Sequence, residues 1–301
     1  MPASTSAVAD PGRLRTYASF VRLEHTLFSL PLILAGVFSV PGPAMGAGRW
    51  LLTAAAAVGA RTAGMSLNRL IDRHLDALNP RTRVRELPAG RMRLAEGVAL
   101  LAASTAVYLA ACAILGPWYL RVAVVPLAVF TLYPYLKRFT PFCHLGVGAA
   151  LALSPLAGYA VAHPDLARPG PALALAGFAL AWVSGFDIIY ATLDEAADRA
   201  NGIHSMVVRL GRAGALRVSW GLHAASALAL GAGLWLLAGG HVARSLWAFV
   251  AAALYAVTCS LLVAEQRLAE DVDLAFFKIN VWVGAAVLAC VLAARMASGG
   301  F

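Results

Sequence analysis

Long apolar blocks separated by short polar stretches dominate this chain. Clear examples are residues 98–115, 122–136, 172–193 and 245–264. Each block approaches the ~20 residues that a helix needs to cross ~30 Å of hydrocarbon. The strands of a spanning β-barrel would instead alternate apolar and polar positions over ~10 residues. The pattern therefore predicts an all-α, polytopic membrane protein.

Nine apolar blocks are long enough to cross the bilayer once each. Their predicted bounds are 17–40, 49–71, 94–115, 118–136, 143–161, 171–191, 215–238, 245–265 and 276–297. Pro31, Pro126, Pro134 and Pro155 fall inside these blocks, where proline is expected to kink a helix. Residues 1–16 are polar, so we expect an N-terminal tail and then one transmembrane domain over 17–301.

The composition agrees, with 60% hydrophobic and 13% charged residues and a mean hydropathy of +0.74. The net charge of +9 does not indicate a nucleic-acid partner, because the basic residues sit in short loops without a binding signature. Most of the 24 lysines and arginines fall on the side of the N-terminus. The positive-inside rule then predicts a cytoplasmic N-terminus in the cell inner membrane, and nine spans place the C-terminus outside.

Acidic side chains are scarce, and several of the 15 gather in two short windows on the basic side. The first window contains Asn68, Asp72 and Asp76, which are spaced four residues apart. A step of four residues advances about 40° around a helix, so these side chains are expected to share one face. Arg61 lies about two turns deeper on that face.

The second window contains Asp187, Tyr190, Asp194 and Asp198 and repeats the helical spacing of the first. We interpret the two windows as an internal repeat, with halves at about 49–93 and 171–214. Two helices that each end in a row of carboxylates, at one depth and on one side, are expected to face each other across a cavity.

Carboxylates one helical turn apart repel each other, so a cation is expected between them. Oxygen ligands without Cys or His in register suit Mg²⁺, which is often shared with substrate phosphates. Loop arginines and lysines could then bind a diphosphate, or they could instead contact lipid headgroups and set the topology. The candidates for the diphosphate are Arg81, Arg85, Lys137 and Arg138, together with Tyr133 in the turn just before Lys137 and Arg138.

These motifs resemble the two signatures of the UbiA superfamily of intramembrane aromatic prenyltransferases. The first signature is Asn68-x3-Asp72-x3-Asp76 followed by Asn79-Pro80-Arg81-Thr82. The second is Asp187-x2-Tyr190-Ala191-x2-Asp194-x3-Asp198, and the turn Tyr133-Pro134-x2-Lys137-Arg138 also fits. The longer strings around them look most like the bacterial 4-hydroxybenzoate polyprenyltransferase branch, part of which is similar to enzymes of the futalosine route to menaquinone.

The resemblance implies nine transmembrane helices around a central cavity open to the bilayer. It also implies transfer of a polyprenyl group from its diphosphate to an aromatic ring carbon, in ubiquinone or menaquinone biosynthesis. The acceptor would be 4-hydroxybenzoate or, by the futalosine route, 1,4-dihydroxy-6-naphthoate. Asn68, Asp72 and Asp76 would hold one Mg²⁺, and Asp194 and Asp198 a second.

Three further residues receive catalytic roles on this interpretation. Tyr190, like Tyr133, could stabilise an allylic cation with its ring face. Asp187 is a candidate for orienting or deprotonating the acceptor, or alternatively for supporting the metals indirectly. Arg61 could bind the acceptor's carboxylate, or it could pair with an aspartate of the second window such as Asp187.

Two rival functions remain open from the sequence. A cation-coupled transporter would explain intramembrane aspartates, but it would not explain the surrounding arginines. A sister enzyme, such as haem O synthase or a homogentisate prenyltransferase, would share the chemistry, although Asn79-Pro80-Arg81-Thr82 favours the benzoate-like branch. The partners expected are polyprenyl diphosphate, a small aromatic acid and the lipid bilayer, with the oligomeric state left open.

Overall fold

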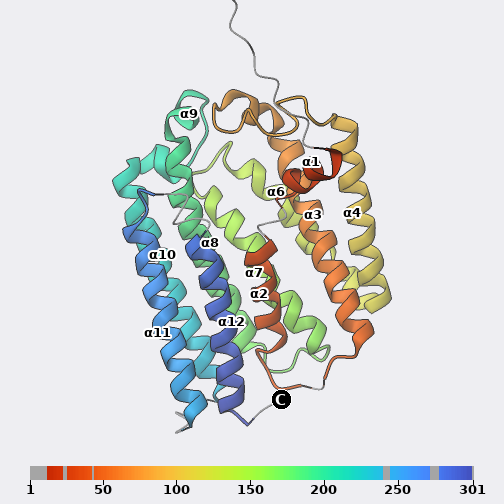
Figure 1. Cartoon of the computed structure of the whole chain (residues 1–301), viewed down its shortest axis with the longest axis vertical. Helices are drawn as coiled ribbons and strands as arrows, with labels where there is room; N and C mark the ends of the chain where they lie inside the picture. Colours follow the sequence, from red (N-terminus) through yellow and green to blue (C-terminus); the bar gives the residue numbers. More distant parts are fainter. Residues whose placement is uncertain (1–11, 23–25, 43, 240–244, 272–277, 300–301) are drawn as a thin grey trace, which may run out of the picture.

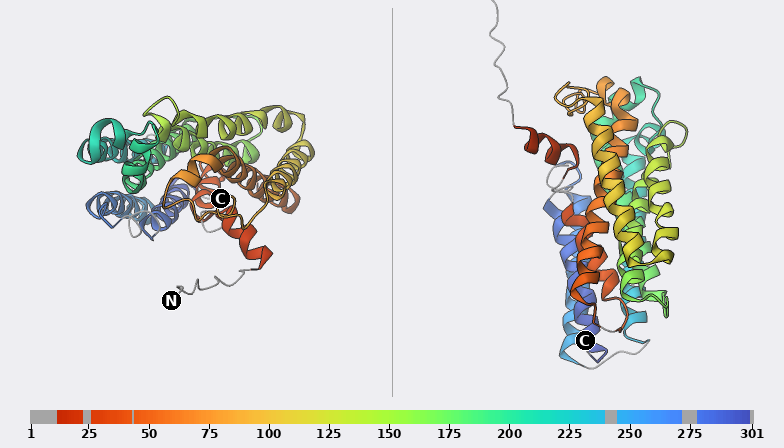
Figure 2. Two further views of the ribbon diagram at one scale, coloured as in Figure 1. Left: turned by 90° about the horizontal axis from the view of Figure 1, so that it is seen from above. Right: turned by 90° about the vertical axis from the view of Figure 1, so that its right-hand side faces the viewer.

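The computed structural model describes residues 12–22, 26–42, 44–239, 245–271 and 278–299 (Figure 1). Within these ranges the chain is helical and contains no β-strand. Most helices run along the long axis of the molecule and form a bundle (Figure 2). The predicted all-α fold is therefore confirmed.

The helices vary from short pieces of six residues to the continuous 32-residue helix Ala47–Leu78. The helix Met206–Leu237 also has 32 residues but is kinked at Gly211, whose φ is 67°. In chain order they are α1 (Arg13–Phe20), α2 (Thr26–Val37), α3 (Ala47–Leu78), α4 (Leu94–Leu115), α5 (Pro117–Val122), α6 (Val124–Leu136), α7 (Cys143–Ala162), α8 (Gly170–Ala191), the 3-10 helix η2 (Thr192–Asp194), α9 (Glu195–Ala200), α10 (Met206–Leu237), α11 (Leu246–Arg267) and α12 (Asn280–Ala297).

Seven helical segments of the described chain are long and apolar enough to cross a membrane. They are Leu94–Leu115, Pro117–Leu136, Cys143–Ala162, Gly170–Ala200, Met206–Leu237, Leu246–Arg267 and Asn280–Ala297. The apolar stretch Ser29–Phe38, which contains most of α2, is shorter, and α3 carries several charged residues. The chain is thus a polytopic membrane protein, and the count of nine spans stays a prediction.

Two predicted spans do not form single helices. Over 17–40, α1 ends at Phe20 and α2 begins at Thr26. Over 118–136, the helix is interrupted at Ala123, between α5 and α6. Pro126 explains the second interruption, because its ring has no N–H to donate and would clash with the Val122 carbonyl in a continuous helix.

The best buried helix is α8, which packs against α7 and α10. Its side chains Phe178, Trp182 and Val183 are almost fully inaccessible and belong to the main hydrophobic core. The backbones of α2 and α7 are in close contact where Gly158 of α7 meets Ile33 of α2. A Cβ added at Gly158 would lie only 2.0 Å from the Ile33 carbonyl oxygen. Small residues permit such close backbone contacts between membrane helices, and this contact fixes α2 beside the bundle interior.

The loop over residues 79–93 lies at the same end of the bundle as α9 (Figure 1). α3 ends before this loop because Asn79 precedes Pro80, and the residue before a proline disfavours helical backbone. α1 is tied to this end, since the Tyr17 hydroxyl donates to Glu96 and the Ser19 hydroxyl donates to Glu86. At this end the Asn79 side chain, just after α3, hydrogen bonds to Asp194, just after α8, so the two acidic windows lie close together.

Candidate active site

One cavity of about 440 Å³ extends from the meeting ends of α3 and α8 into the bundle. Twelve of the thirteen predicted site residues line it, the exception being Arg138. They are Arg61, Asn68, Asp72, Asp76, Arg81, Arg85, Tyr133, Lys137, Asp187, Tyr190, Asp194 and Asp198. Residues from both halves of the chain thus share one site.

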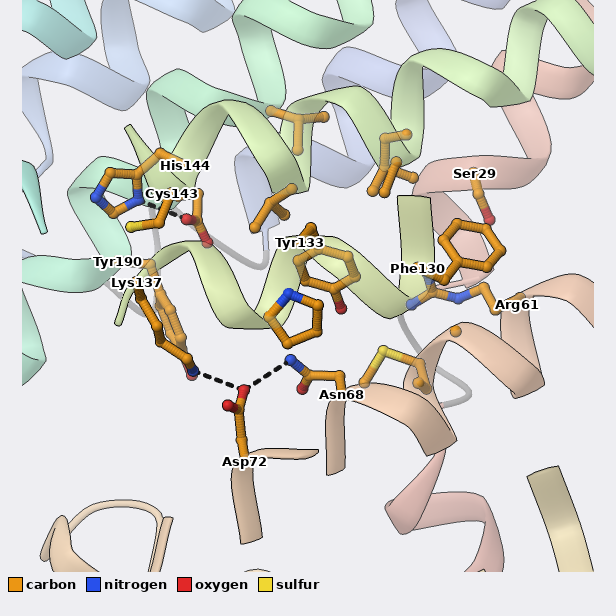
Figure 3. A pocket seen from close by; sticks show the side chains of 18 of the residues that line it. Ser29, Arg61, Asn68, Asp72, Phe130, Tyr133, Lys137, Cys143, His144 and Tyr190 are labelled. Carbon is orange, nitrogen blue, oxygen red and sulfur yellow. Dashed lines mark hydrogen bonds and ion pairs between the residues drawn. The ribbon is translucent and has the colours of Figure 1, made fainter. Parts of the chain in front are cut away.

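The first window lies on one continuous helix, α3, as its spacing predicts. Asn68 donates from its amide to Asp72 Oδ2 at 3.1 Å, and Lys137 Nζ lies 2.6 Å from the same oxygen (Figure 3). Asp72 is only 1% exposed, so its negative charge needs such a partner. Arg138 adds a second cation at 3.7 Å, from outside the cavity lining.

Asp76 follows one turn later on α3 and is also buried. Arg85 Nη1 donates to Asp76 Oδ1 at 2.6 Å, and the Thr82 hydroxyl donates to the Asp76 carbonyl at 3.0 Å. The loop after α3 therefore folds back over the carboxylates of its own helix. Among the described residues, Asp72 Oδ1 and Asp76 Oδ2 are buried and accept no hydrogen bond.

The second window does not lie on one continuous helix, although its spacing predicted one continuous helical face. α8 ends at Ala191, a 3-10 turn covers Thr192–Asp194, and α9 follows. Within this turn the Thr192 hydroxyl donates to the Ile189 carbonyl at 2.7 Å. Asp194 and Asp198 nevertheless both line the cavity.

Arg81 joins the loop after α3 to the second window. Its guanidinium binds both carboxylate oxygens of Asp194, with Nε 2.8 Å from Oδ1, and its Nη1 lies 2.5 Å from the Tyr190 hydroxyl. The guanidinium carbon also lies 4.6 Å from the centre of the Tyr190 ring. Burial alone would lower the pKa of Arg81, but the hydrogen bonds and negative charge of Asp194 outweigh it and raise that pKa.

Two residues without a predicted role, Asn79 and His144, also contribute to the site. The Asn79 amide donates to Asp194 Oδ1 at 2.7 Å. His144 Nδ1 lies 2.6 Å from Asp187 Oδ2, across the contact between α7 and α8. No sequence spacing could have found this pair, because 43 residues separate its members.

The deeper part of the cavity is more apolar. Arg61 lies there near Phe130 and Ser29, beyond Tyr133 and Asn68 as seen from Lys137 (Figure 3). Its location on the Asn68 face of α3 agrees with the predicted helical register. Asp187 is paired with His144 instead of standing alone, and the role of Arg61 stays a prediction.

The described residues hold no group of three His, Cys, Asp or Glu side chains set as a ready metal site. The donor types nevertheless fit Mg²⁺, because they are carboxylate and amide oxygens lining one cavity. The buried Asp72 and Asp76 oxygens without hydrogen bonds also fit a cation ligand. The donor atoms are therefore of the type that Mg²⁺ prefers, although the described residues do not form a preassembled cluster of metal ligands.

Known proteins match this chain along most of its length. The sequence model of the UbiA prenyltransferase family matches residues 29–294. The chain is 30% identical to 4-hydroxybenzoate geranyltransferase 1 of Lithospermum erythrorhizon, over 95% of this chain and 92% of that protein. It is also 30% identical to a 4-hydroxybenzoate octaprenyltransferase of Ralstonia nicotianae, over 77% and 82% of the two chains.

Solved structures share the fold. A UbiA homolog from Aeropyrum pernix superposes with a TM-score of 0.79 at 34% identity, covering 90% of this chain and 98% of that one. A UbiA homolog from Archaeoglobus fulgidus, solved with GPP and Mg²⁺, gives a TM-score of 0.71 at 17% identity, over 94% and 99% of the chains.

Proposed function

This chain belongs to the UbiA prenyltransferase family, and from that premise we propose that it transfers a polyprenyl group from polyprenyl diphosphate to a ring carbon of an aromatic acid. Diphosphate is the leaving group, and the new bond joins the first prenyl carbon to the ring. The acceptor is of the 4-hydroxybenzoate type, which the relatives from L. erythrorhizon and R. nicotianae are named for. The product would enter quinone biosynthesis.

One observation carries this proposal: carboxylates and cations from both halves of the chain meet in a single cavity. Lys137, Arg81 and Arg85 supply positive charge and several N–H donors, which suit a diphosphate. Most of the remaining lining of the cavity is apolar and suits a prenyl chain. Its walls include Leu32, Ile33, Phe130, Val147, Leu151 and Val161.

Mg²⁺ is the cofactor that the donor set supports. Asn68, Asp72 and Asp76 would hold one ion, and Asp194 and Asp198 a second. When bound, Mg²⁺ would draw charge from the diphosphate as the allylic C–O bond ionises.

The chain's own residues would supply the other requirements of the reaction. Lys137, Arg81 and Arg85 orient the diphosphate. The ring faces of Tyr133 and Tyr190 stabilise the allylic cation, and the apolar walls keep water away from it. Arg138 lies outside the cavity lining, and its positive charge would help to keep Asp72 ionised.

Arg61 would bind the carboxylate of the aromatic acid. It lies about 10 Å below Asn68 along α3, at ~1.5 Å per residue, so the acceptor ring would sit beneath the diphosphate. Asp187 would then accept the proton that the ring loses, with indirect support of the metals as the alternative role. The same arrangement could accept 1,4-dihydroxy-6-naphthoate, which also carries a carboxylate on an aromatic ring.

The active end of the cavity would face the cytoplasm, which supplies Mg²⁺ and receives diphosphate. The basic loop over 79–93 and the segment over 199–212 lie at this end, in agreement with the positive-inside rule. The N-terminus and both acidic windows are then cytoplasmic, and the C-terminus is outside the inner membrane.

A membrane assay tests this function. Membranes containing the protein are incubated with labelled polyprenyl diphosphate, Mg²⁺ and either 4-hydroxybenzoate or 1,4-dihydroxy-6-naphthoate. We expect a labelled, prenylated product with at least one acid, loss of product with EDTA, and recovery with excess Mg²⁺. Failure to prenylate either acid across several donor chain lengths would contradict the proposal.

A further inference from the structure

The buried imidazole of His144 pairs with the partly exposed carboxylate of Asp187 at the edge of the cavity. His144 is 4% exposed, whereas the Asp187 side chain is 25% exposed, and both line the cavity. Their contact joins His144 Nδ1 to Asp187 Oδ2 at 2.6 Å (Figure 3). One carboxylate oxygen is therefore bound to the imidazole.

The other imidazole nitrogen identifies the tautomer. The backbone N–H of Met206 donates to His144 Nε2 at 3.3 Å. Met206 is the first residue of α10, and the first N–H groups of a helix have no acceptor within it. Because Nε2 accepts, Nδ1 carries the ring proton and donates it in a hydrogen bond to Asp187.

Contacts between α7, α8 and the segment before α10 hold the backbone around His144 in place. The Ser184 hydroxyl donates to the His144 carbonyl at 3.1 Å. A Cβ at Gly148 would lie 2.2 Å from Ser184 Oγ, so α7 and α8 are in close contact one turn from His144. The backbone N–H of His204 donates to the Lys137 carbonyl at 2.7 Å, which fixes the start of α10 against the loop after α6.

We propose that His144 is a positioning residue for proton removal from the acceptor ring, an inference that rests on the proposed function. Its Nδ1–H holds Asp187 Oδ2, so that Asp187 Oδ1 is presented to the ring as an ionised base. After the prenyl carbon has bonded to the ring, Asp187 takes the proton from that ring carbon. The C–H electron pair restores aromaticity, and the resulting carboxylic acid releases its proton to water when the products leave.

Two matched substitutions test the direction of the hydrogen bond. In His144→Asn the side-chain amide can reach the place of Nδ1 and still donate to Asp187. In His144→Gln it reaches toward the place of Nε2 and Met206. We expect His144→Gln to lower kcat about ten- to a hundredfold, whereas kcat of His144→Asn should stay within about threefold of the parent value. In both variants, KM for the prenyl diphosphate and KM for the aromatic acid should change less than about threefold.

An isotope effect separates positioning from mere structural support. The acceptor is deuterated at the ring carbon that becomes prenylated. In the parent, ionisation is expected to limit the rate and to leave little isotope effect, whereas in His144→Gln C–H cleavage should become partly limiting and give a measurable one. His163→Asn is the control, because His163 is similarly buried at the opposite end of α7 and should show no isotope effect.

Asp187→Asn provides the coupling test. Adding His144→Gln to Asp187→Asn should lower kcat little further, because residues acting through one group are not additive. Equal losses in His144→Gln and His144→Asn, or full additivity with Asp187→Asn, would overturn the positioning role while leaving prenyl transfer intact. Absence of prenyl transfer by the parent protein would instead remove the proposed function itself.

Discussion

Replacing Arg81 tests the site most directly, because this side chain connects the two halves of the chain. It binds both oxygens of Asp194, contacts the Tyr190 hydroxyl, and lies over the Tyr190 ring. When a prenyl diphosphate is bound, we expect the guanidinium to bind phosphate oxygens in the same region. Arg81→Ala removes every one of these contacts, and Arg81→Lys keeps the charge but loses the planar fork.

The size of the effect follows from the contacts. A hydrogen bond from the guanidinium to a charged phosphate oxygen contributes about 1.5–3 kcal/mol, and the planar guanidinium can donate two of them at once. These terms are not additive, and water screens part of them because the Arg81 side chain is 29% exposed. A total of about 3 kcal/mol is reasonable, which corresponds to an increase of about 100-fold in KM for the prenyl diphosphate. Arg81→Lys should lose about half of this energy and raise KM about tenfold.

The assay measures initial rates in membranes with each substrate varied in turn, together with inhibition by inorganic diphosphate. KM for the diphosphate substrate and the inhibition constant for diphosphate should rise together, while KM for the aromatic acid stays within about threefold. Arg83→Ala is the matched control, because Arg83 is exposed in the same loop and does not line the cavity. Equal rises in both KM values, or unchanged inhibition by diphosphate, would refute the reasoning.

Three further outcomes are expected. Four single alanine variants replace Asp72, Asp76, Asp194 or Asp198. Each should lower the transfer rate about a thousandfold at saturating Mg²⁺ without preventing membrane insertion, and near-normal rates in two of them would contradict the two-metal arrangement. Single cysteines at Ala89 and Ala200, in a background without the four native cysteines, should react with an impermeant thiol reagent only in inverted vesicles, whereas one at Ala167 should react in intact cells. Arg61→Leu should raise KM for the aromatic acid at least about tenfold and KM for the prenyl diphosphate less than about threefold, and a parallel rise in both would exclude the carboxylate role.

The fold was largely predictable, because apolar length alone identifies a membrane helix. Its interruptions were harder to place. The break at Ala123 depends on where Pro126 falls relative to the carbonyl four residues earlier, and neither proline nor glycine marks the 3-10 turn over Thr192–Asp194. Interruptions of this kind leave no trace in hydropathy.

The site was predictable where its signal is local. The four-residue spacing of Asn68, Asp72 and Asp76 is a property of one helix, so helical geometry alone places these side chains on one face. The partners of these carboxylates are not local, since 113 residues separate Arg81 from Asp194. Such contacts depend on how helices pack, and only the folded chain shows that His144 reaches Asp187.

The division of the site between α3 and the segment after α8 has a consequence for how the enzyme comes into being. Asn79 and Asp194, which are hydrogen bonded in the folded chain, are separated by 115 residues. A chain still emerging from the ribosome inserts α3 long before it can present Asp194 and Asp198. On the proposed function, an unfinished molecule would therefore have only part of the residues proposed to bind Mg²⁺ and diphosphate, and it could not yet ionise a prenyl diphosphate.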